Sequence, residues 1–329
     1  MSLTLSVRRS TIVPYKPPLT EKNLPDQAGK VFIVTGGSGG LGKELVDILY
    51  QHNGRVYIAA RSEAKTSAVI TELQAKHPGS QGQLAFLPLQ LEDLSTIRGT
   101  ADAFLARESR LDVLWNNAGV MVPPQGSTTA QGHELQQGVN NLGHFLLTSL
   151  LLPTLRQTAA AASTSASTST TTTAVGSVRV VWVSSSAADA APQPALDFGN
   201  MDYRLREEGI WQKYARSKAA CQLHASELAR RTAGSGIITV ALNPGNFLTS
   251  LQQNMPKMQV FMFKFVSSEP KNGAYTELFA GLSPTISEKD NGGWVSPFGK
   301  LDTPRKDLVE PELCARYWDW SEQQVKEYM

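Results

Sequence analysis

Short apolar runs alternate along this chain with stretches in which apolar residues recur at helical spacing. Five of the runs are rich in aliphatic residues and predict buried strands, at residues 31–35, 55–60, 112–115, 178–183 and 237–242. After the first run, one face of a predicted helix carries the apolar residues Leu41, Leu45, Ile48 and Leu49. The first part of this pattern is therefore a strand, a turn and a helix.

The turn between that strand and that helix is rich in glycine. Residues 35–42 read Thr-Gly-Gly-Ser-Gly-Gly-Leu-Gly. Glycines let the backbone come close to a pyrophosphate, which then rests on the N-terminus of the following helix. Glycine-rich turns are common, but one placed after a strand and before a helix predicts a dinucleotide site. The candidate cofactor contacts here are Gly36, Ser38, Gly39, Gly40, Leu41 and Gly42.

The residue that ends the second strand bears on which dinucleotide is bound. About 20 positions after such a turn, an acidic residue would bind the adenosine ribose and would repel a 2′-phosphate. Arg61 stands at this place with Lys65 nearby, whereas Glu63 lies past the strand end. Because a guanidinium is suited to bind a phosphate, the sequence favours NADP(H) over NAD(H). The alternative is an ordinary surface arginine in a loop.

Tyr214 and Lys218 lie four residues apart in a stretch that predicts a helix. Positions i and i+4 share a helix face, so the phenol and the ammonium can point into one site. A free tyrosine titrates near ~10, and a fixed positive charge beside it lowers that pKa. Such a tyrosine can exchange a proton with a carbonyl oxygen near neutral pH. The pair also arises often by chance, so its weight depends on the other motifs.

Taken in order, the motifs resemble those of the short-chain dehydrogenase/reductase family. They are Thr35-Gly36-x-x-x-Gly40-x-Gly42, Asn117-Ala118-Gly119, Asn140, Ser185, Tyr214-x-x-x-Lys218 and Pro244-Gly245-x-x-x-Thr249. They extend over about residues 28 to 300, and their shared order makes the resemblance specific. The interval from Ser185 to Tyr214 is similar to the retinol-dehydrogenase-like and WW-domain-oxidoreductase-like branch, and residues 292–299 are similar to the fungal members.

The resemblance implies a fold and a set of roles. The fold is a single doubly wound Rossmann domain of the α/β class, with a mostly parallel sheet and helices on both faces. Tyr214 would be the general acid in reduction, Lys218 would bind the nicotinamide ribose and lower the Tyr214 pKa, and Ser185 would bind the substrate oxygen. Asn140 would hold a water that links Lys218 to solvent. The other implied cofactor contacts are Gln90, Leu91, Asn117, Ala118, Gly119, Pro244, Gly245 and Thr249.

Two of these assignments are choices between neighbours. Ser185 stands in a run of three serines, and it fits the family pattern better than Ser184 or Ser186. Asn140 is followed by Asn141, and the first of the two fits the pattern better. Each choice stays open to a shift by one residue.

One position departs from the family pattern. After the third strand the family usually has an aspartate that touches the adenine amine, whereas this chain has Gln90. A glutamine can still accept a hydrogen bond through its carbonyl. A register shift of three residues would give the role to Asp93 instead.

Composition narrows the class of protein. The 329 residues carry a formal net charge of +2 and no basic run of the kind that follows a phosphate backbone, so nucleic-acid binding is set aside. The two cysteines, Cys221 and Cys314, lie far apart and do not suggest a disulfide framework. His133 and His144 lack metal-ligand spacing with cysteine or acidic residues, so no metal site is expected.

The motifs divide the chain into three parts. Residues 1–29 are an N-terminal arm with no apolar run long enough for a signal peptide or a membrane span, which predicts a cytoplasmic protein. Residues 30–300 hold the Rossmann domain, and residues 301–329 form a helical tail packed on it. Within the domain, residues 158–176 are rich in alanine, serine and threonine. They predict a disordered insertion on the side away from the active site.

Residues 247–268 follow the last predicted strand and are rich in methionine and phenylalanine, which form an adaptable apolar surface. We expect a lid over a bulky apolar substrate. The alternatives are core packing, a subunit interface or contact with a membrane surface. The apolar helices over 145–155 and 214–228 leave a homodimer through paired helices open.

The expected activity is NADP(H)-dependent interconversion of a carbonyl and an alcohol on a small molecule, in the direction of ketone or aldehyde reduction. One alternative is a non-redox enzyme on the same site, such as an epimerase or cyclase. Another is a catalytically silent protein that binds NADP(H) and has a regulatory role.

Overall fold

The structure is a computed structural model that describes residues 15–168, 176–247 and 267–329. Its strands are β1 (Val31–Thr35), β2 (Arg55–Ala60), β3 (Gln83–Pro88), β4 (Val113–Asn116), β5 (Val178–Val183), β6 (Ile237–Leu242), β7 (Trp294–Ser296) and β8 (Lys300–Asp302). In this described part they form one sheet in the order β3-β2-β1-β4-β5-β6-β7-β8. Every neighbouring pair is parallel except β7 with β8. The expected doubly wound α/β fold is confirmed.

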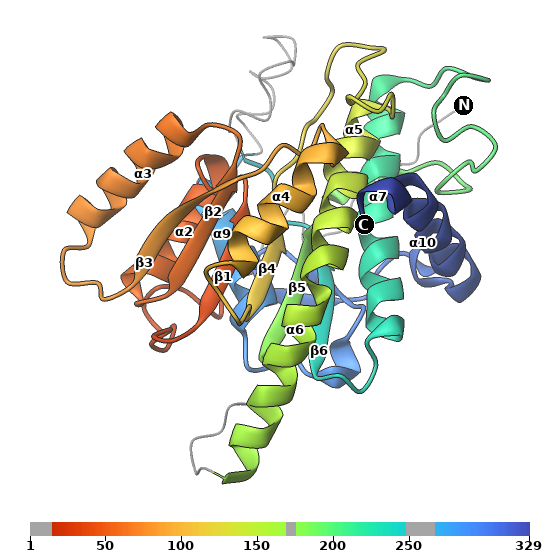
Figure 1. Ribbon diagram of the computed structural model, residues 1–329. Helices are drawn as coiled ribbons and strands as arrows, with labels where there is room; N and C mark the ends of the chain where they lie inside the picture. The colour runs from red at the N-terminus through yellow and green to blue at the C-terminus, as the bar shows by residue number, and fades with distance from the viewer. Residues whose placement is uncertain (1–14, 169–175, 248–266) are drawn as a thin grey trace.

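Helices cover both faces of the sheet (Figure 1). The α-helices are α2 (Gly40–Gln51), α3 (Glu63–Lys76), α4 (Leu94–Leu105), α5 (Leu135–Gln137), α6 (Gly143–Thr168), α7 (Ile210–Arg231), α9 (Pro270–Leu282) and α10 (Pro311–Val325). A π-helix, η1 (Gly138–Leu142), leads directly into α6. Short 3₁₀ turns are η2 (Ser186–Ala190), η4 (Glu288–Asp290), η5 (Lys306–Val309) and η6 (Lys326–Tyr328).

Strand β5 shows why the apolar runs are continuous rather than alternating. All of its residues are buried. Val180 and Trp182 belong to the cluster under α4, α6 and α7, whereas Val181 and Val183 belong to the cluster under α2 and α9. Successive side chains of a strand point to opposite faces. A strand with a helix layer on each face is therefore mostly apolar, and the one charged residue of β5, Arg179, is buried with its guanidinium hydrogen-bonded to backbone oxygens.

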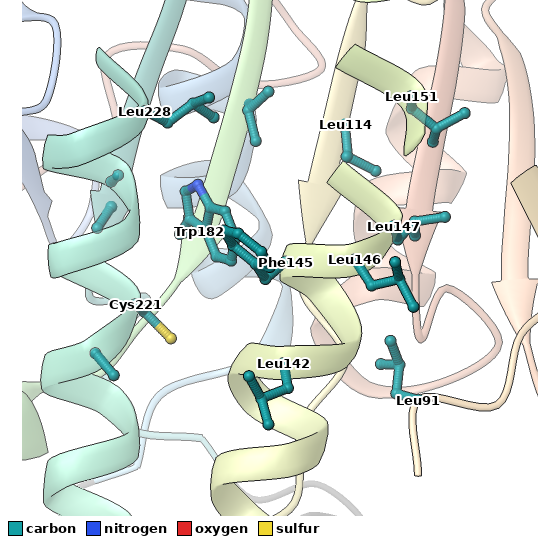
Figure 2. Packing of buried hydrophobic residues seen from close by; sticks show 14 of the residues in the cluster. Leu91, Leu114, Leu142, Phe145, Leu146, Leu147, Leu151, Trp182, Cys221 and Leu228 are labelled. Atoms are coloured by element: carbon teal, nitrogen blue, oxygen red, sulfur yellow. The ribbon is translucent and has the colours of Figure 1, made fainter. Parts of the chain in front are cut away.

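An aromatic cluster holds α6, β5, α7 and α10 together. His224 of α7 stacks on Phe145 at 4.9 Å and on Tyr317 at 4.5 Å, and its ring centroid lies 5.0 Å from that of Trp182. Figure 2 shows Phe145 and Trp182 inside this layer. Helix α10 runs beside α7 (Figure 1), and every residue of α7 from Lys213 to Ala229 is buried in one chain. A homodimer through α7 would have to displace α10.

The described part of the N-terminal arm packs on the domain. Leu19 and Leu24 are buried in the cluster formed by α2, α9 and the sheet. The carboxylate of Glu21 accepts hydrogen bonds from Lys271 Nζ at 2.9 Å and from Tyr275 OH at 2.7 Å, both on α9. The arm is thus tied to the face of the sheet that α9 covers.

Two expected segments fall only partly within the described residues. The low-complexity insertion was expected to begin at Thr158, but α6 continues to Thr168, and the buried Thr158 hydroxyl accepts a hydrogen bond from Leu111 N at 3.0 Å. Alanine has the highest helix propensity, so the alanine run after Thr158 extends the helix. Residues 169–175 lie outside the described part. Most of the expected lid, residues 248–266 with Thr249, also lies outside it.

Candidate active site

The carboxyl ends of four neighbouring strands bring the predicted site residues to one edge of the sheet. Strands β1, β4, β5 and β6 lie side by side and run parallel. They lead into the glycine turn, residues 117–119, the serines at 184–186 and the loop at 243–245. In an open α/β sheet this edge is where ligands bind.

Close packing explains two of the key glycines. Gly36 has a φ of 71°, and a β-carbon there would lie 3.1 Å from the α-carbon of Ala118. A β-carbon on Gly42 would lie 2.5 Å from Asn117 Nδ2 and 2.9 Å from the carbonyl oxygen of Gly36. Helix α2 begins at Gly40, and no side chain in the described part of the chain caps its N-terminus. Its first N–H groups therefore stay available to an anion such as a pyrophosphate.

The hydroxyl of Thr35 connects the glycine turn to the loop after β4. It accepts hydrogen bonds from the backbone N–H groups of Asn117 at 2.8 Å and Ala118 at 2.9 Å. It also lies 2.9 Å from Nε2 of His144, whose Nδ1 lies 3.3 Å from the carbonyl oxygen of Asn140. Burial lowers the pKa of His144 to about 3, so the ring is neutral. A neutral ring satisfies both contacts by donating from Nδ1 and accepting at Nε2.

The sequence motifs indicate no separate role for Thr35, and the spacing of His144 does not suggest a metal ligand. A polar residue at the end of the otherwise apolar run 31–35 was the available signal for Thr35. Thr35 and His144 are 109 residues apart in the sequence, so no local pattern predicts their contact.

Asn140 and Lys218 converge at Gly119. A β-carbon at Gly119 would lie 3.0 Å from Asn140 Oδ1 and 3.5 Å from Lys218 Nζ. The side chain of Asn140 donates to Val120 O at 3.1 Å and to Ser217 Oγ at 3.0 Å, and it accepts from Val120 N at 2.9 Å. Asn140 stands in the π-helix η1, a rare conformation that occurs frequently at functional sites. The loop after β4 is thereby bound to α7.

Neighbouring side chains have structural contacts of their own. Ser184 Oγ donates to the backbone oxygen of Lys218 at 2.6 Å, and Asn141 Nδ2 donates to the backbone oxygen of Ser217 at 2.9 Å. Ser185 Oγ instead accepts a hydrogen bond from Ala187 N at 3.2 Å, and its hydroxyl acts on Tyr214 by lowering the pKa of the phenol. Of the neighbouring pair Ser184 and Ser185, only the second affects the pKa of Tyr214 in this way within the described residues.

Tyr214 and Lys218 are each 5% exposed on the same face of α7. Lys218 Nζ lies 5.9 Å from the centroid of the Tyr214 ring and donates to Val183 O at 2.9 Å. Burial raises the pKa of Tyr214 well above its ordinary value, although the Ser185 hydroxyl opposes the shift. The expected lowering by Lys218 is not found, because desolvation is the largest effect on the phenol. Burial likewise lowers the pKa of Lys218.

The loop after β6 is held close to the site edge. Gly245 has a φ of 109°, and a β-carbon there would lie 3.0 Å from the Phe247 ring and 3.1 Å from that of Phe298. The carbonyl oxygen of Pro244 accepts a hydrogen bond from Thr276 Oγ1 of α9 at 3.3 Å. Glycine is required at position 245 for both its backbone angle and this close approach.

Two cations stand beside the glycine turn at the end of β2. Arg61 is exposed and forms an ion pair with the carboxylate of Glu92 at 3.0 Å. The ammonium of Lys65 lies 3.1 Å from the position that a β-carbon of Gly39 would occupy. A phosphate bound beside Gly39 would contact Lys65 directly. Arg61 would contact it only after breaking its ion pair with Glu92.

The loop after β3 separates two candidates for an adenine contact. Asp93 caps helix α4, accepting hydrogen bonds from Ser95 N at 3.1 Å and from Gln131 Nε2 at 2.8 Å. These contacts lower the pKa of Asp93. The side chain of Gln90 is exposed, and the neighbouring Leu91 is buried against α6.

A buried carboxyl lies behind the site and was not found from the sequence. Glu277 of α9 is fully buried, and neither of its oxygens makes a hydrogen bond to the rest of the described chain. Burial raises the pKa of Glu277 to about 8, while the charge of Lys218 opposes the shift. A single glutamate in a predicted helix carries no signal of burial, since burial depends on what packs around it.

The described residues contain neither a side-chain cluster suited to a metal ion nor a helix suited to cross a membrane. No group of three histidine, cysteine, aspartate or glutamate side chains there is arranged to hold a metal ion. No helix within those ranges is both long and apolar enough to cross a membrane.

Comparisons with known proteins bear on the family. A family profile described as short chain dehydrogenase matches residues 30–189. A protein of Emericella nidulans named short-chain dehydrogenase/reductase pkfC is 52% identical over 317 residues, covering 95% of this chain and 98% of that protein. The chain belongs to the short-chain dehydrogenase/reductase family. A short-chain dehydrogenase/reductase of Phomopsis amygdali is 45% identical over 97% of this chain and 96% of its own length.

Solved structures agree with this short-chain dehydrogenase/reductase fold. An uncharacterised protein from Mycobacterium paratuberculosis is 29% identical, with a TM-score of 0.69 over 94% of this chain and 97% of that chain. The Pseudomonas aeruginosa RhlG/NADP active-site complex is 25% identical, with a TM-score of 0.59 over 82% and 94%. The protein is therefore an oxidoreductase by family.

Proposed function

We propose that this short-chain dehydrogenase/reductase is an NADP(H)-dependent carbonyl reductase that acts on an apolar ketone or aldehyde. The observation that carries the proposal is the buried Tyr214, which shares one face of α7 with Lys218 and whose pKa is lowered by the nearby Ser185 hydroxyl. Because burial raises the pKa of Tyr214, the phenol keeps its proton at neutral pH. A protonated phenol can donate a proton to a carbonyl oxygen, as the reduction of a ketone or aldehyde requires.

The residues of the site divide the remaining tasks. The cofactor supplies the hydride when it is bound. Ser185 and Tyr214 hold the carbonyl oxygen by two hydrogen bonds, and Tyr214 passes its proton to that oxygen as negative charge develops there. Lys218 orients the ribose end of the cofactor. Asn140, which meets Lys218 at Gly119, serves the return of a proton to Tyr214.

The cradle at the glycine turn fits a dinucleotide pyrophosphate. Gly36 and Gly42 leave no space for a β-carbon, and the N-terminus of α2 is uncapped. Arg61 and Lys65 support a 2′-phosphate and hence NADP(H), since no carboxylate replaces Arg61 at the end of β2. The RhlG structure, which is described with NADP, supports the same choice. Gln90 supports an adenine contact because Asp93 is already used as a helix cap.

The test is NADPH oxidation with a panel of aliphatic and aromatic ketones and aldehydes. Tyr214→Phe removes the proposed proton donor and should lower kcat at least about 100-fold, within the range ascribed to general acid catalysis. Tyr275→Phe is the matched control, because its hydroxyl bonds Glu21 on the face of α9 away from the site. Turnover that survives in Tyr214→Phe would refute the mechanism. Product formed without net loss of NADPH would instead indicate an epimerase or cyclase.

A further inference from the structure

On helix α7, Trp211 lies on the same face as Tyr214 and Lys218, and the three residues form a stripe along the helix. Trp211 precedes Tyr214 by three positions and Lys218 by seven, so the three side chains lie along one face of the helix. The rings of Trp211 and Tyr214 meet edge to face, with centroids 6.2 Å apart and planes at 85°. The stripe thus continues from Lys218 through Tyr214 to the first turn of the helix.

Exposure changes sharply along this stripe. Lys218 and Tyr214 are each 5% exposed, whereas the indole of Trp211 is 44% exposed. A large apolar side chain placed in this way keeps one part of its ring system against the tyrosine and leaves another part open. Because the two rings are in contact, a substrate whose carbonyl reaches Tyr214 can place its adjoining part against the open part of the indole.

Charges around Trp211 neutralise one another. Residues 197–216 hold four acidic and four basic side chains, and each takes part in an ion pair within that interval. Arg206 pairs with Asp197, and Arg216 pairs with Glu208 at 2.7 Å. With its charges paired internally, this segment presents no unpaired charge of its own to a charged substrate. An uncharged molecule suits the region better.

We infer that Trp211 selects the substrate, and that the preferred substrate is an uncharged ketone with a planar aromatic ring system beside the carbonyl. This inference rests on the proposed reductase function. The indole packs on the flat ring while the carbonyl oxygen reaches Ser185 and Tyr214. Aromatic rings gain from packing on one another beyond the area that they bury. Trp211 is a specificity residue, and it takes no part in proton or hydride transfer.

The test compares two ketones with the same number of carbon atoms, 2-acetylnaphthalene and 2-dodecanone. Wild type, Trp211→Ala and Trp211→Phe are assayed with saturating NADPH. Trp211→Ala should raise KM for the naphthyl ketone about 2- to 10-fold, which is the range expected for one aromatic pair. Its kcat and its KM for 2-dodecanone should stay near wild type. Trp211→Phe, which keeps an aromatic face, should recover most of the loss.

Leu205→Ala is the matched control, because Leu205 is 83% exposed on the same segment but lies outside helix α7. It should behave as wild type with both ketones. Equal rises of KM for both ketones in Trp211→Ala would show a structural role and overturn the inference. Unchanged KM for the naphthyl ketone would overturn it as well.

A binding experiment separates failure of this inference from failure of the proposed reductase. Calorimetric titration of 2-acetylnaphthalene uses Tyr214→Phe with NADPH, where chemistry is blocked, and compares it with the Tyr214→Phe/Trp211→Ala double variant. Weaker binding to the double variant supports the inference even if the wild type reduces neither ketone. No binding to either protein, or equal binding to both, overturns it.

Discussion

Replacing Glu277 with glutamine should remove a pH dependence from the free energy of unfolding. The carboxyl of Glu277 is fully buried on α9, and its oxygens have no hydrogen-bond partner in the described residues. Burial disfavours the charged carboxylate and raises the pKa from 4.5 to about 8. The folded protein therefore keeps a proton that the unfolded chain releases.

The direction of the effect follows from proton counting. Between pH 4.5 and about 8 the folded state binds more protons at Glu277 than the unfolded state does. Stability then falls as the pH rises. The contribution is fully present below pH 4.5 and is lost as the pH passes about 8. At ~1.4 kcal/mol for each pH unit, the whole interval corresponds to about 5 kcal/mol.

Two buried histidines also make the free energy of unfolding depend on pH, and this limits the pH range in which the effect of Glu277 can be measured. Burial lowers the pKa of both His144 and His224 from 6.5 to about 3. Their contribution to stability therefore increases with pH up to 6.5 and stays constant above it. Between pH 6.5 and 8 these histidines no longer contribute a slope. Over that window Glu277 should lower the stability of the wild type by about 2 kcal/mol.

The assay is urea unfolding of wild type and Glu277→Gln, followed by circular dichroism at several pH values from 6.5 to 8. The variant should lack the decline of about 2 kcal/mol, whatever its absolute stability, because its amide does not ionise. Glu72→Gln is the control, since Glu72 is more than half exposed beside Lys43. Parallel curves for wild type and Glu277→Gln would refute the reasoning.

Four further substitutions test the cofactor site and the contacts that hold it. Gly42→Ala forces a β-carbon against a side-chain amide and a backbone carbonyl. It should lower the free energy of unfolding by about 1–3 kcal/mol and weaken NADPH binding measured by calorimetry. Gly79→Ala is the control, because a β-carbon there meets open space. Arg61→Ala should weaken NADPH but not NADH, and Glu92→Gln should strengthen NADPH by freeing Arg61; equal effects on both cofactors would contradict the phosphate contact. Thr35→Val leaves two backbone donors without their acceptor and should lower the unfolding free energy by about 2–5 kcal/mol; a smaller loss would show that water replaces the hydroxyl.

Much of the fold was predictable from local patterns. The five apolar runs overlap β1, β2, β4, β5 and β6, because a strand buried on both faces is mostly apolar. The glycine turn was predictable for a similar reason, since close approach at Gly36 and Gly42 excludes a β-carbon. The low-complexity run predicts disorder from Thr158 onward, whereas helix α6 continues to Thr168. The prediction rested on composition, but the alanines after Thr158 favour a helix.

Local sequence patterns were enough to predict the order of the main strands along the chain, the glycine turn and the candidate site residues. These features depend on side-chain size and polarity over a few neighbouring positions. Only the tertiary structure decided the ionisation of Tyr214, Lys218 and Glu277, because a pKa depends on burial by segments distant in the chain. It also decided the Arg61–Glu92 ion pair and the contact of Thr35 with His144. Each of these requires strands or helices to pack before the side chains can meet.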